Sequence, residues 1–82
     1  MKSQTIKIRG VDVEIYWGEG PGVGMAVHTV PSADLDEGTA AGPNDGEEFE
    51  LDGRAYELGQ HDYETGGDET TCSAAIYELE AE

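Results

Sequence analysis

The sequence predicts a mainly β protein: one small antiparallel sheet, built as a meander of hairpins with five or six strands and at most one short helix. Residues 11–17 alternate apolar and polar side chains with a period of two, which is the pattern of a half-buried strand. An Asp-Gly pair at 52–53 separates two further alternating runs and indicates a tight hairpin turn. With 82 residues, the chain has room for one small domain, residues 1–82.

The first two strands are expected to form an N-terminal hairpin. Residues 4–9 place Ile6 and Ile8 on one face, Gly10-Val11 turns the chain, and residues 12–17 return as the second strand. The first strand is basic and the second is acidic. Opposite charges are therefore expected to pair across this hairpin and to stabilise it slightly.

The middle of the chain combines a strand with irregular segments. Residues 18–24 are rich in glycine and form a loop, and residues 25–30 read as a third strand. Residues 31–47 are predicted to be a mobile acidic loop, rich in Pro, Gly, Asp and Ala. Within it, Ser32 is placed to cap a short turn of helix over residues 33–37, because acidic side chains suit the first turn of a helix.

The Asp-Gly turn at 52–53 also predicts a register for the hairpin that spans residues 48–58. One side of this hairpin is then apolar, and the other places two like charges directly opposite each other. The expected pairs are Leu51 with Arg54, Phe49 with Tyr56, Glu50 with Ala55, and Glu48 with Glu57.

The C-terminal segment fits two patterns. Residues 55–64, a turn at 66–68 and a strand at 70–80 would continue the meander, and this is the preferred prediction. The strand face is then expected to carry Ser73, Ala75, Tyr77 and Leu79. The alternative is a C-terminal helix over residues 69–80, which would make the fold α+β.

Charge limits the classes of function. The chain has 19 Asp and Glu residues against 4 Lys and Arg, a formal net charge of -15. This field repels nucleic acid and anionic lipid, so direct nucleic-acid binding and membrane binding are not expected. A single cysteine forms no internal disulfide, and the N-terminus has no apolar stretch typical of a signal peptide. We therefore expect a cytoplasmic protein, in the host cytoplasm if a phage encodes it.

The acidic residues recur at alternate positions in several stretches, as in residues 12–14, 48–52 and 78–82. On a strand, such neighbours point the same way and lie about 6.8 Å apart. Ordinary sheets avoid like charges directly opposite each other, so these rows suggest a functional surface. The predicted partner-binding residues, with the tyrosine as an aromatic anchor, are Asp12, Glu14, Tyr16, Glu48, Glu50, Asp52, Glu57, Glu78 and Glu80.

No pattern in the sequence predicts catalysis, a metal site or a cofactor. Cys72, His28 and His61 are residue types suited to a nucleophile with its base or to a zinc site, but their spacing matches neither motif. Cys72 lies in an apolar segment, where a buried, inert thiol is expected.

Two hypotheses of function follow. Fixed rows of carboxylates can imitate a phosphate backbone and occupy the basic groove of a nucleic-acid-binding protein. In size and charge the chain is similar to small acidic inhibitors from phages and mobile elements, including DNA-mimic restriction inhibitors and anti-CRISPR proteins. That resemblance implies a non-enzymatic inhibitor. The alternative is a small structural domain, adapted to high salt or paired as a homodimer through an edge strand.

Overall fold

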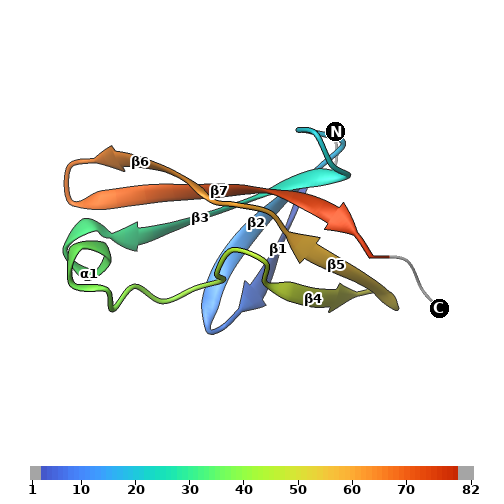
Figure 1. Cartoon of the computed structure of the whole chain (residues 1–82), viewed down its shortest axis with the longest axis horizontal. Helices are drawn as coiled ribbons and strands as arrows, with labels where there is room; N and C mark the ends of the chain where they lie inside the picture. The colour runs from blue at the N-terminus through green and yellow to red at the C-terminus, as the bar shows by residue number, and fades with distance from the viewer. Residues whose placement is uncertain (1–2, 80–82) are drawn as a thin grey trace.

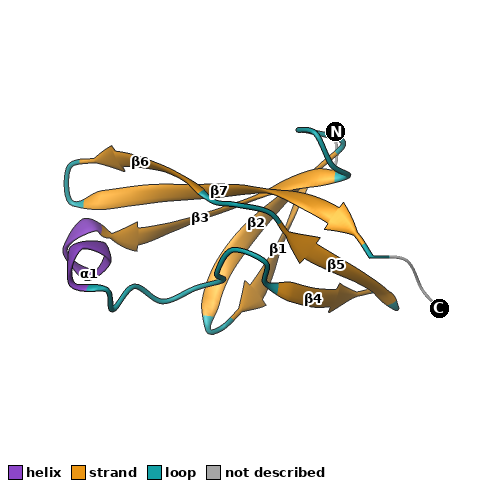
Figure 2. Ribbon diagram, in the orientation of Figure 1, coloured by secondary structure: helices purple, strands orange, loops and turns teal. Residues whose placement is uncertain are grey.

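In the part of the chain that the structure describes, seven strands form one antiparallel sheet, and one short helix lies at its end (Figures 1 and 2). The computed structural model describes residues 3–79. The predicted mainly β fold with one short helix is confirmed. The elements are β1 (Ser3–Ile8), β2 (Val11–Trp17), β3 (Gly24–Pro31), α1 (Ser32–Glu37), β4 (Glu48–Leu51), β5 (Arg54–Leu58), β6 (Asp62–Gly66) and β7 (Glu69–Glu78).

The strand order is β1-β2-β3-β7-β5-β4, with β6 paired to β7 as well. This order differs from a simple meander at two steps, because β3 pairs with the last strand and not with the next one, and β7 pairs with β5 as well as with β6. The chain after β3 passes through α1 and residues 38–47, which run back along the sheet to β4 (Figure 1). A long connection of this kind has no local sequence signal, and so the hairpin pattern alone does not predict it.

The long C-terminal strand confirms the preferred prediction for this segment, and the alternative helix over 69–80 is wrong for the described part. The predicted strand at 55–64 divides into β5 and β6, which both pair with β7 along different stretches. Residues 59–61 leave the ladder between them. This division accounts for a strand count one above the expected maximum.

Two hairpins close through two-residue turns with positive φ. At the β4–β5 turn, Asp52 and Gly53 have φ of 52° and 80°, and the predicted register is confirmed in full. At the β1–β2 turn, the two residues are Arg9 and Gly10, with φ of 51° and 80°. The predicted turn at Gly10-Val11 was one residue too late, since a turn of this type needs positive φ at both of its central positions.

The core lies on one side of the coiled sheet and contains side chains from strands at both of its ends. Trp17 of β2 and Phe49 of β4 each contact the ring of Tyr56 on β5, with ring centroids 5.4 and 5.5 Å apart. The core cluster consists of Ile8, Val13, Ile15, Ala26, Tyr56, Leu58, Ala74 and Ile76. In β7 the buried face is therefore the even-numbered one, and the predicted face with Ser73, Ala75, Tyr77 and Leu79 points the other way.

The helix α1 has six residues and ends at Gly38, whose φ of 75° is left-handed. Pro31 occupies the N-cap position and makes no capping hydrogen bond from its side chain, so the predicted cap by Ser32 is wrong. The Ser32 hydroxyl instead donates to the carbonyl of Gly67, 3.0 Å away, in the β6–β7 turn. Within residues 3–79, no helix has the length and apolar character needed to cross a membrane.

Candidate functional site

The side of the sheet that points away from the core, here called the outer face, carries much of the acidic charge. In β2 the side chains of Val13 and Ile15 are fully buried, so the alternate residues Asp12, Glu14 and Tyr16 point outward. The hydroxyl of Tyr16 donates a hydrogen bond to the carboxylate of Glu14. This bond holds the phenol in its protonated form and raises the pKa of Tyr16.

A second group of outward carboxylates comes from the β4–β5 hairpin. Glu48 lies directly opposite Glu57, and Glu50 lies opposite Ala55. Like charges in that position destabilise a strand pair. In the part of the chain that the structure describes, no Lys or Arg forms an ion pair with any of these three glutamates. The hairpin therefore retains a repulsion that a single lysine would remove.

An uncharged band separates the acids of β2 from a third group of outward acids on β6. Glu14 of β2 faces Val27, which faces Ser73, which faces Asp62 of β6, so the band is two strands wide. The ladder spacing places the acids on its two sides about 14 Å apart, beyond the Debye length of about 8 Å at physiological salt. The outward side chains of the band are Met25, Val27, Thr29, Thr71, Ser73 and Ala75.

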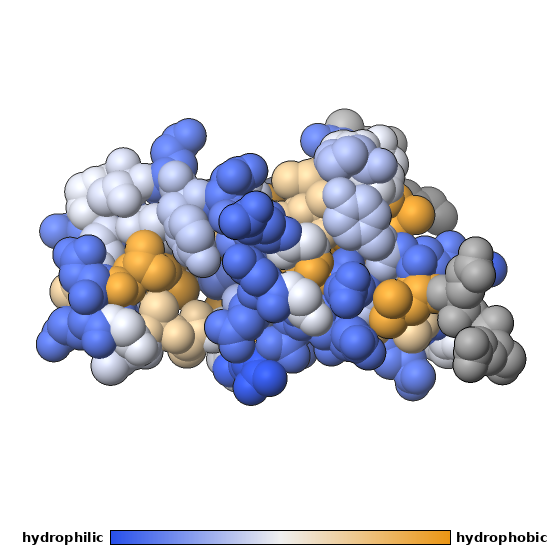
Figure 3. Space-filling model, viewed as in Figure 1, coloured by the Kyte–Doolittle hydropathy of each residue, from blue (hydrophilic) through white to orange (hydrophobic). Residues whose placement is uncertain are grey.

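These features define a surface, here called the acidic face, made of the outward carboxylates of β2, β4, β5 and β6 and the uncharged band between them. Its members are Asp12, Glu14, Glu48, Glu50, Glu57, Asp62 and Glu64. Tyr16 and the half-exposed Tyr77 lie beside these acids. Figure 3 shows hydrophilic side chains over most of one side of the molecule, with smaller apolar patches between them.

Every Lys and Arg within residues 3–79 is already held by an acid. The ion pairs are Lys7 Nζ with Asp12 Oδ1 at 3.6 Å, Arg9 Nε with Glu47 Oε1 at 2.6 Å, and Arg54 Nη1 with Glu78 Oε2 at 3.1 Å. The first confirms the opposite-charge pairing expected across the N-terminal hairpin. The acids left without such a partner, including Glu14, supply the field of the outer face.

The remaining predicted residues fall elsewhere. Asp52 lies at the β4–β5 turn and is exposed. Glu78 lies opposite Tyr56, on the core side of the sheet, and is bound to Arg54. It does not join the acids of the hairpin. Glu78 lies two residues after the buried Ile76 on the same strand, so its side chain points to the same, core side of the sheet. Glu80 lies outside the described residues.

A second feature, which the sequence did not reveal, is a cavity of about 190 Å³ between the sheet and the segment that follows α1. On its sheet side, His28 of β3 lies directly opposite Cys72 of β7, and Cys72 lies opposite Tyr63 of β6. The rings of His28 and His61 meet edge to face, with centroids 5.6 Å apart. The cavity therefore brings together residues that are far apart in the sequence.

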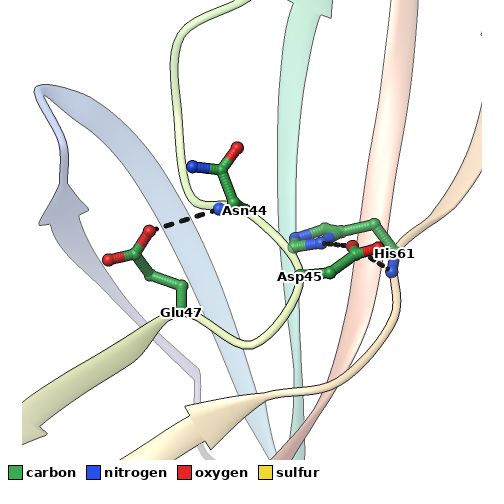
Figure 4. Close-up of polar contacts among 4 residues, drawn as sticks. All are labelled: Asn44, Asp45, Glu47 and His61. Atoms are coloured by element: carbon green, nitrogen blue, oxygen red, sulfur yellow. Dashed lines mark hydrogen bonds and ion pairs between the residues drawn. The ribbon is translucent and has the colours of Figure 1, made fainter.

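Both imidazoles in this cavity are buried, but their environments differ. His61 donates its backbone N–H and its ring Nδ1–H to one oxygen of Asp45, each over 2.8 Å (Figure 4). These bonds lower the pKa of Asp45, the backbone bond most of all. Burial, and secondarily the neighbouring His61, lower the pKa of His28. At neutral pH, His28 is therefore uncharged and Asp45 is ionised.

The arrangement gives little support to catalysis by Cys72. The thiol is buried as predicted, and burial raises its pKa, which disfavours the reactive thiolate. Among the described residues, no group of three or more His, Cys, Asp or Glu side chains is arranged to hold a metal ion. What the cavity offers chemically is a set of hydrogen-bonding groups in a partly apolar pocket.

The segment 38–47, whose residues up to Asn44 line this cavity opposite the sheet, is attached at its C-terminal end. Glu47 Oε1 accepts hydrogen bonds from Arg9 Nε at 2.6 Å and from the backbone N–H of Asn44 at 3.3 Å (Figure 4). The bond from Arg9 is the main cause of a lowered pKa at Glu47. The sequence predicts a mobile loop here. These bonds and the Asp45–His61 contact attach the segment to the β1–β2 turn and to residue 61.

Comparison of the chain with protein-family models, with curated proteins and with solved structures finds no match.

Proposed function

We propose that this protein is a non-enzymatic binding protein that presents its acidic face to a basic, nucleic-acid-binding protein. In this proposal the face occupies the groove that normally holds the nucleic-acid backbone and so inhibits the target. Such a target is of the kind that phage and mobile-element inhibitors act on in host defence. The protein would then act in the cytoplasm, where its target binds nucleic acid.

The observation that carries the proposal is the set of outward carboxylates without cationic partners on the β4–β5 hairpin, above all Glu48 opposite Glu57. A phosphate backbone offers a basic groove the same chemistry, namely closely spaced fixed negative charges on a stiff support. Binding to such a face would gain from long-range steering and from the release of counterions, so it would weaken steeply as salt rises. Tyr16 and Tyr77 add aromatic rings, which favour contact with arginine.

A second function has an observation of its own in its favour. Exposed acids also occur outside the acidic face, including Asp36 and Glu37 on α1 and Asp68 at the β6–β7 turn. Charge spread over the whole surface is what adaptation to high salt would produce, because screening at about 1 M salt removes the repulsion. The protein would then be a small structural domain whose surface charge is an adaptation to high salt.

An affinity capture experiment tests the first proposal against this alternative. The bait is compared with a triple variant of the acidic face, Glu48→Gln, Glu50→Gln and Glu57→Gln. A matched control removes three charges elsewhere through Asp36→Asn, Glu37→Gln and Asp68→Asn. We expect a basic protein that the wild type and the control both capture, that the face variant loses, and that duplex DNA displaces. Equal loss with both variants would show that net charge alone governs capture and would contradict the proposal.

A further inference from the structure

The cavity beside α1 contains two imidazole nitrogens that have no hydrogen-bond partner in the described part of the chain. They are Nδ1 of His28 and Nε2 of His61. The two residues are only 6% and 5% exposed, so neither nitrogen can turn to bulk water. A buried polar atom without a partner is costly, and its persistence points to a group that fills the site when the protein is at work.

The hydrogen bonds around His61 define what that group must offer. Asp45 accepts the Nδ1–H of His61, and in the neutral form of a ring with this tautomer the lone pair is on Nε2. Nε2 therefore requires a donor. Only one oxygen of Asp45 receives the bonds from His61, and this side chain is 53% exposed, in a neighbouring hollow that Asn44 shares with the cavity. The site thus combines an imidazole acceptor with a nearby carboxylate.

The charge and shape of the cavity limit the chemical class of the ligand further. Among residues 3–79, no Lys or Arg lines the cavity, and its walls include the apolar side chains of Val30, Leu35 and Pro43. The field of a chain with a net charge of -15 disfavours an anion. The exposed ring of Tyr63 lies 6.4 Å from that of His61, with 29° between the ring planes, and offers a flat surface on which a planar cation can stack.

We propose that this cavity receives the guanidinium group of an arginine side chain from the basic partner. A guanidinium is planar, carries five N–H donors and no acceptor, and stacks on aromatic rings. The inference rests on the proposed function and specifies the partner's chemistry. Strand β6 connects the two surfaces, because Asp62 and Glu64 point to the acidic face while Tyr63 lines the cavity. A partner on the acidic face can therefore reach around this edge with one side chain.

The cavity can be tested without knowing the partner, using methylguanidinium as the probe. Its neutral isostere N-methylurea is the control, and the ring signals of His28 and His61 are followed by NMR. We expect methylguanidinium to shift both sets of signals to saturation and N-methylurea to bind at least about tenfold more weakly. Equal binding of the two probes, or shifts confined to residues of the acidic face, would overturn the inference.

The variant His61→Phe keeps a flat ring but removes the acceptor, and is expected to weaken methylguanidinium binding at least about tenfold. A pH titration of the wild type gives a second readout that needs no variant. The groups around His61 are Asp45, His28, Tyr63 and Cys72. Burial lowers the pKa of His28, and its protonation adds positive charge to the cavity, so binding should weaken at acidic pH. Binding that is unchanged there would contradict the inference.

Partner capture separates this inference from the proposed function. If the triple variant of the acidic face loses the partner while His61→Phe binds it with unchanged affinity, the cavity inference fails and the proposed function stands. If methylguanidinium fills the cavity but the face variant still binds the partner normally, the proposed function fails. The cavity then remains a site for a cation.

Discussion

His28 and Gly42 meet where the segment after α1 crosses the sheet. Gly42 has a φ of 116°, and a Cβ atom at this position would lie 2.9 Å from Nε2 of His28. The segment can therefore approach the imidazole only through a residue without a side chain. On the sheet side, His28 faces the buried thiol of Cys72. The ring is held by packing on both sides and has no ion pair within the described residues.

The packing of His28 predicts a pH dependence of stability. Burial lowers its pKa below the ordinary value of 6.5, so below that pH the unfolded chain binds the proton more readily than the folded one. The free energy of unfolding should therefore fall as the pH is lowered through 6.5. Asp45 and Glu47, whose pKa values are also lowered, lose their stabilising effect only at more acidic pH. Urea unfolding of the wild type and of His28→Phe measures the effect, and a slope that survives in the variant would contradict it.

The substitution Gly42→Ala should destabilise the protein through both backbone strain and a clash. We expect a loss of about 1–3 kcal/mol in the free energy of unfolding. Gly46→Ala is the matched control, because Gly46 also has positive φ, 77°, but a Cβ atom there meets nothing within 4 Å. Chemical denaturation of both variants separates strain from contact. If Gly42→Ala and Gly46→Ala lost the same free energy of unfolding, a Cβ atom at residue 42 would not clash with His28.

At the level of elements, local signals determine the hairpins and long-range contacts determine the rest. The Asp-Gly turn at 52–53 is sufficient to predict the register of β4 and β5, because the turn type fixes which residues face each other. Nothing local predicts that β3 pairs with β7, or that β5 and β6 separate at residues 59–61. At Gly59 a Cβ atom would lie 3.0 Å from the ring of Tyr77, a contact set by a strand far along the chain.

The pair of glutamates across the β4–β5 hairpin predicts a stabilising substitution. Glu57→Lys turns a like-charge pair with Glu48 into an attractive one and should raise the free energy of unfolding by about 0.5 kcal/mol at low salt. The gain should vanish at about 1 M salt, where screening removes both interactions. Glu57→Gln serves as the control and should gain less. A variant that is no more stable than the wild type at low salt would show that the two carboxylates do not repel each other measurably.

The candidate site was predictable in part, for reasons that concern the whole molecule. Alternation alone places Glu14, Glu48 and Glu57 on outward positions, because one side of each strand is apolar. Alternation does not place Glu78 correctly, because its side chain lies on the core side of β7 and pairs with Arg54. The imidazole cavity was not predictable, since Asp45 and His61 are 16 residues apart and meet only after the connection from α1 has folded back.

Charge over the whole molecule predicts how folding responds to salt. The ion pairs of Lys7, Arg9 and Arg54 join neighbouring strands or bring the two ends of the coiled sheet together. Together with the core, they should keep the protein folded at low salt, and circular dichroism between about 0.02 M and about 2 M salt checks this. Loss of the β spectrum on removal of salt would favour adaptation to high salt over a functional acidic face.

The central claim is that the acidic face and a nucleic acid compete for one groove on the partner. The most direct test is fluorescence anisotropy of labelled duplex DNA bound to the captured target while this protein is added. The account predicts that the DNA is released as the protein binds, with an apparent affinity that falls steeply as salt rises. The Glu48→Gln, Glu50→Gln and Glu57→Gln variant should release it much less effectively. A stable ternary complex, in which the target holds the DNA and this protein together, would contradict the account.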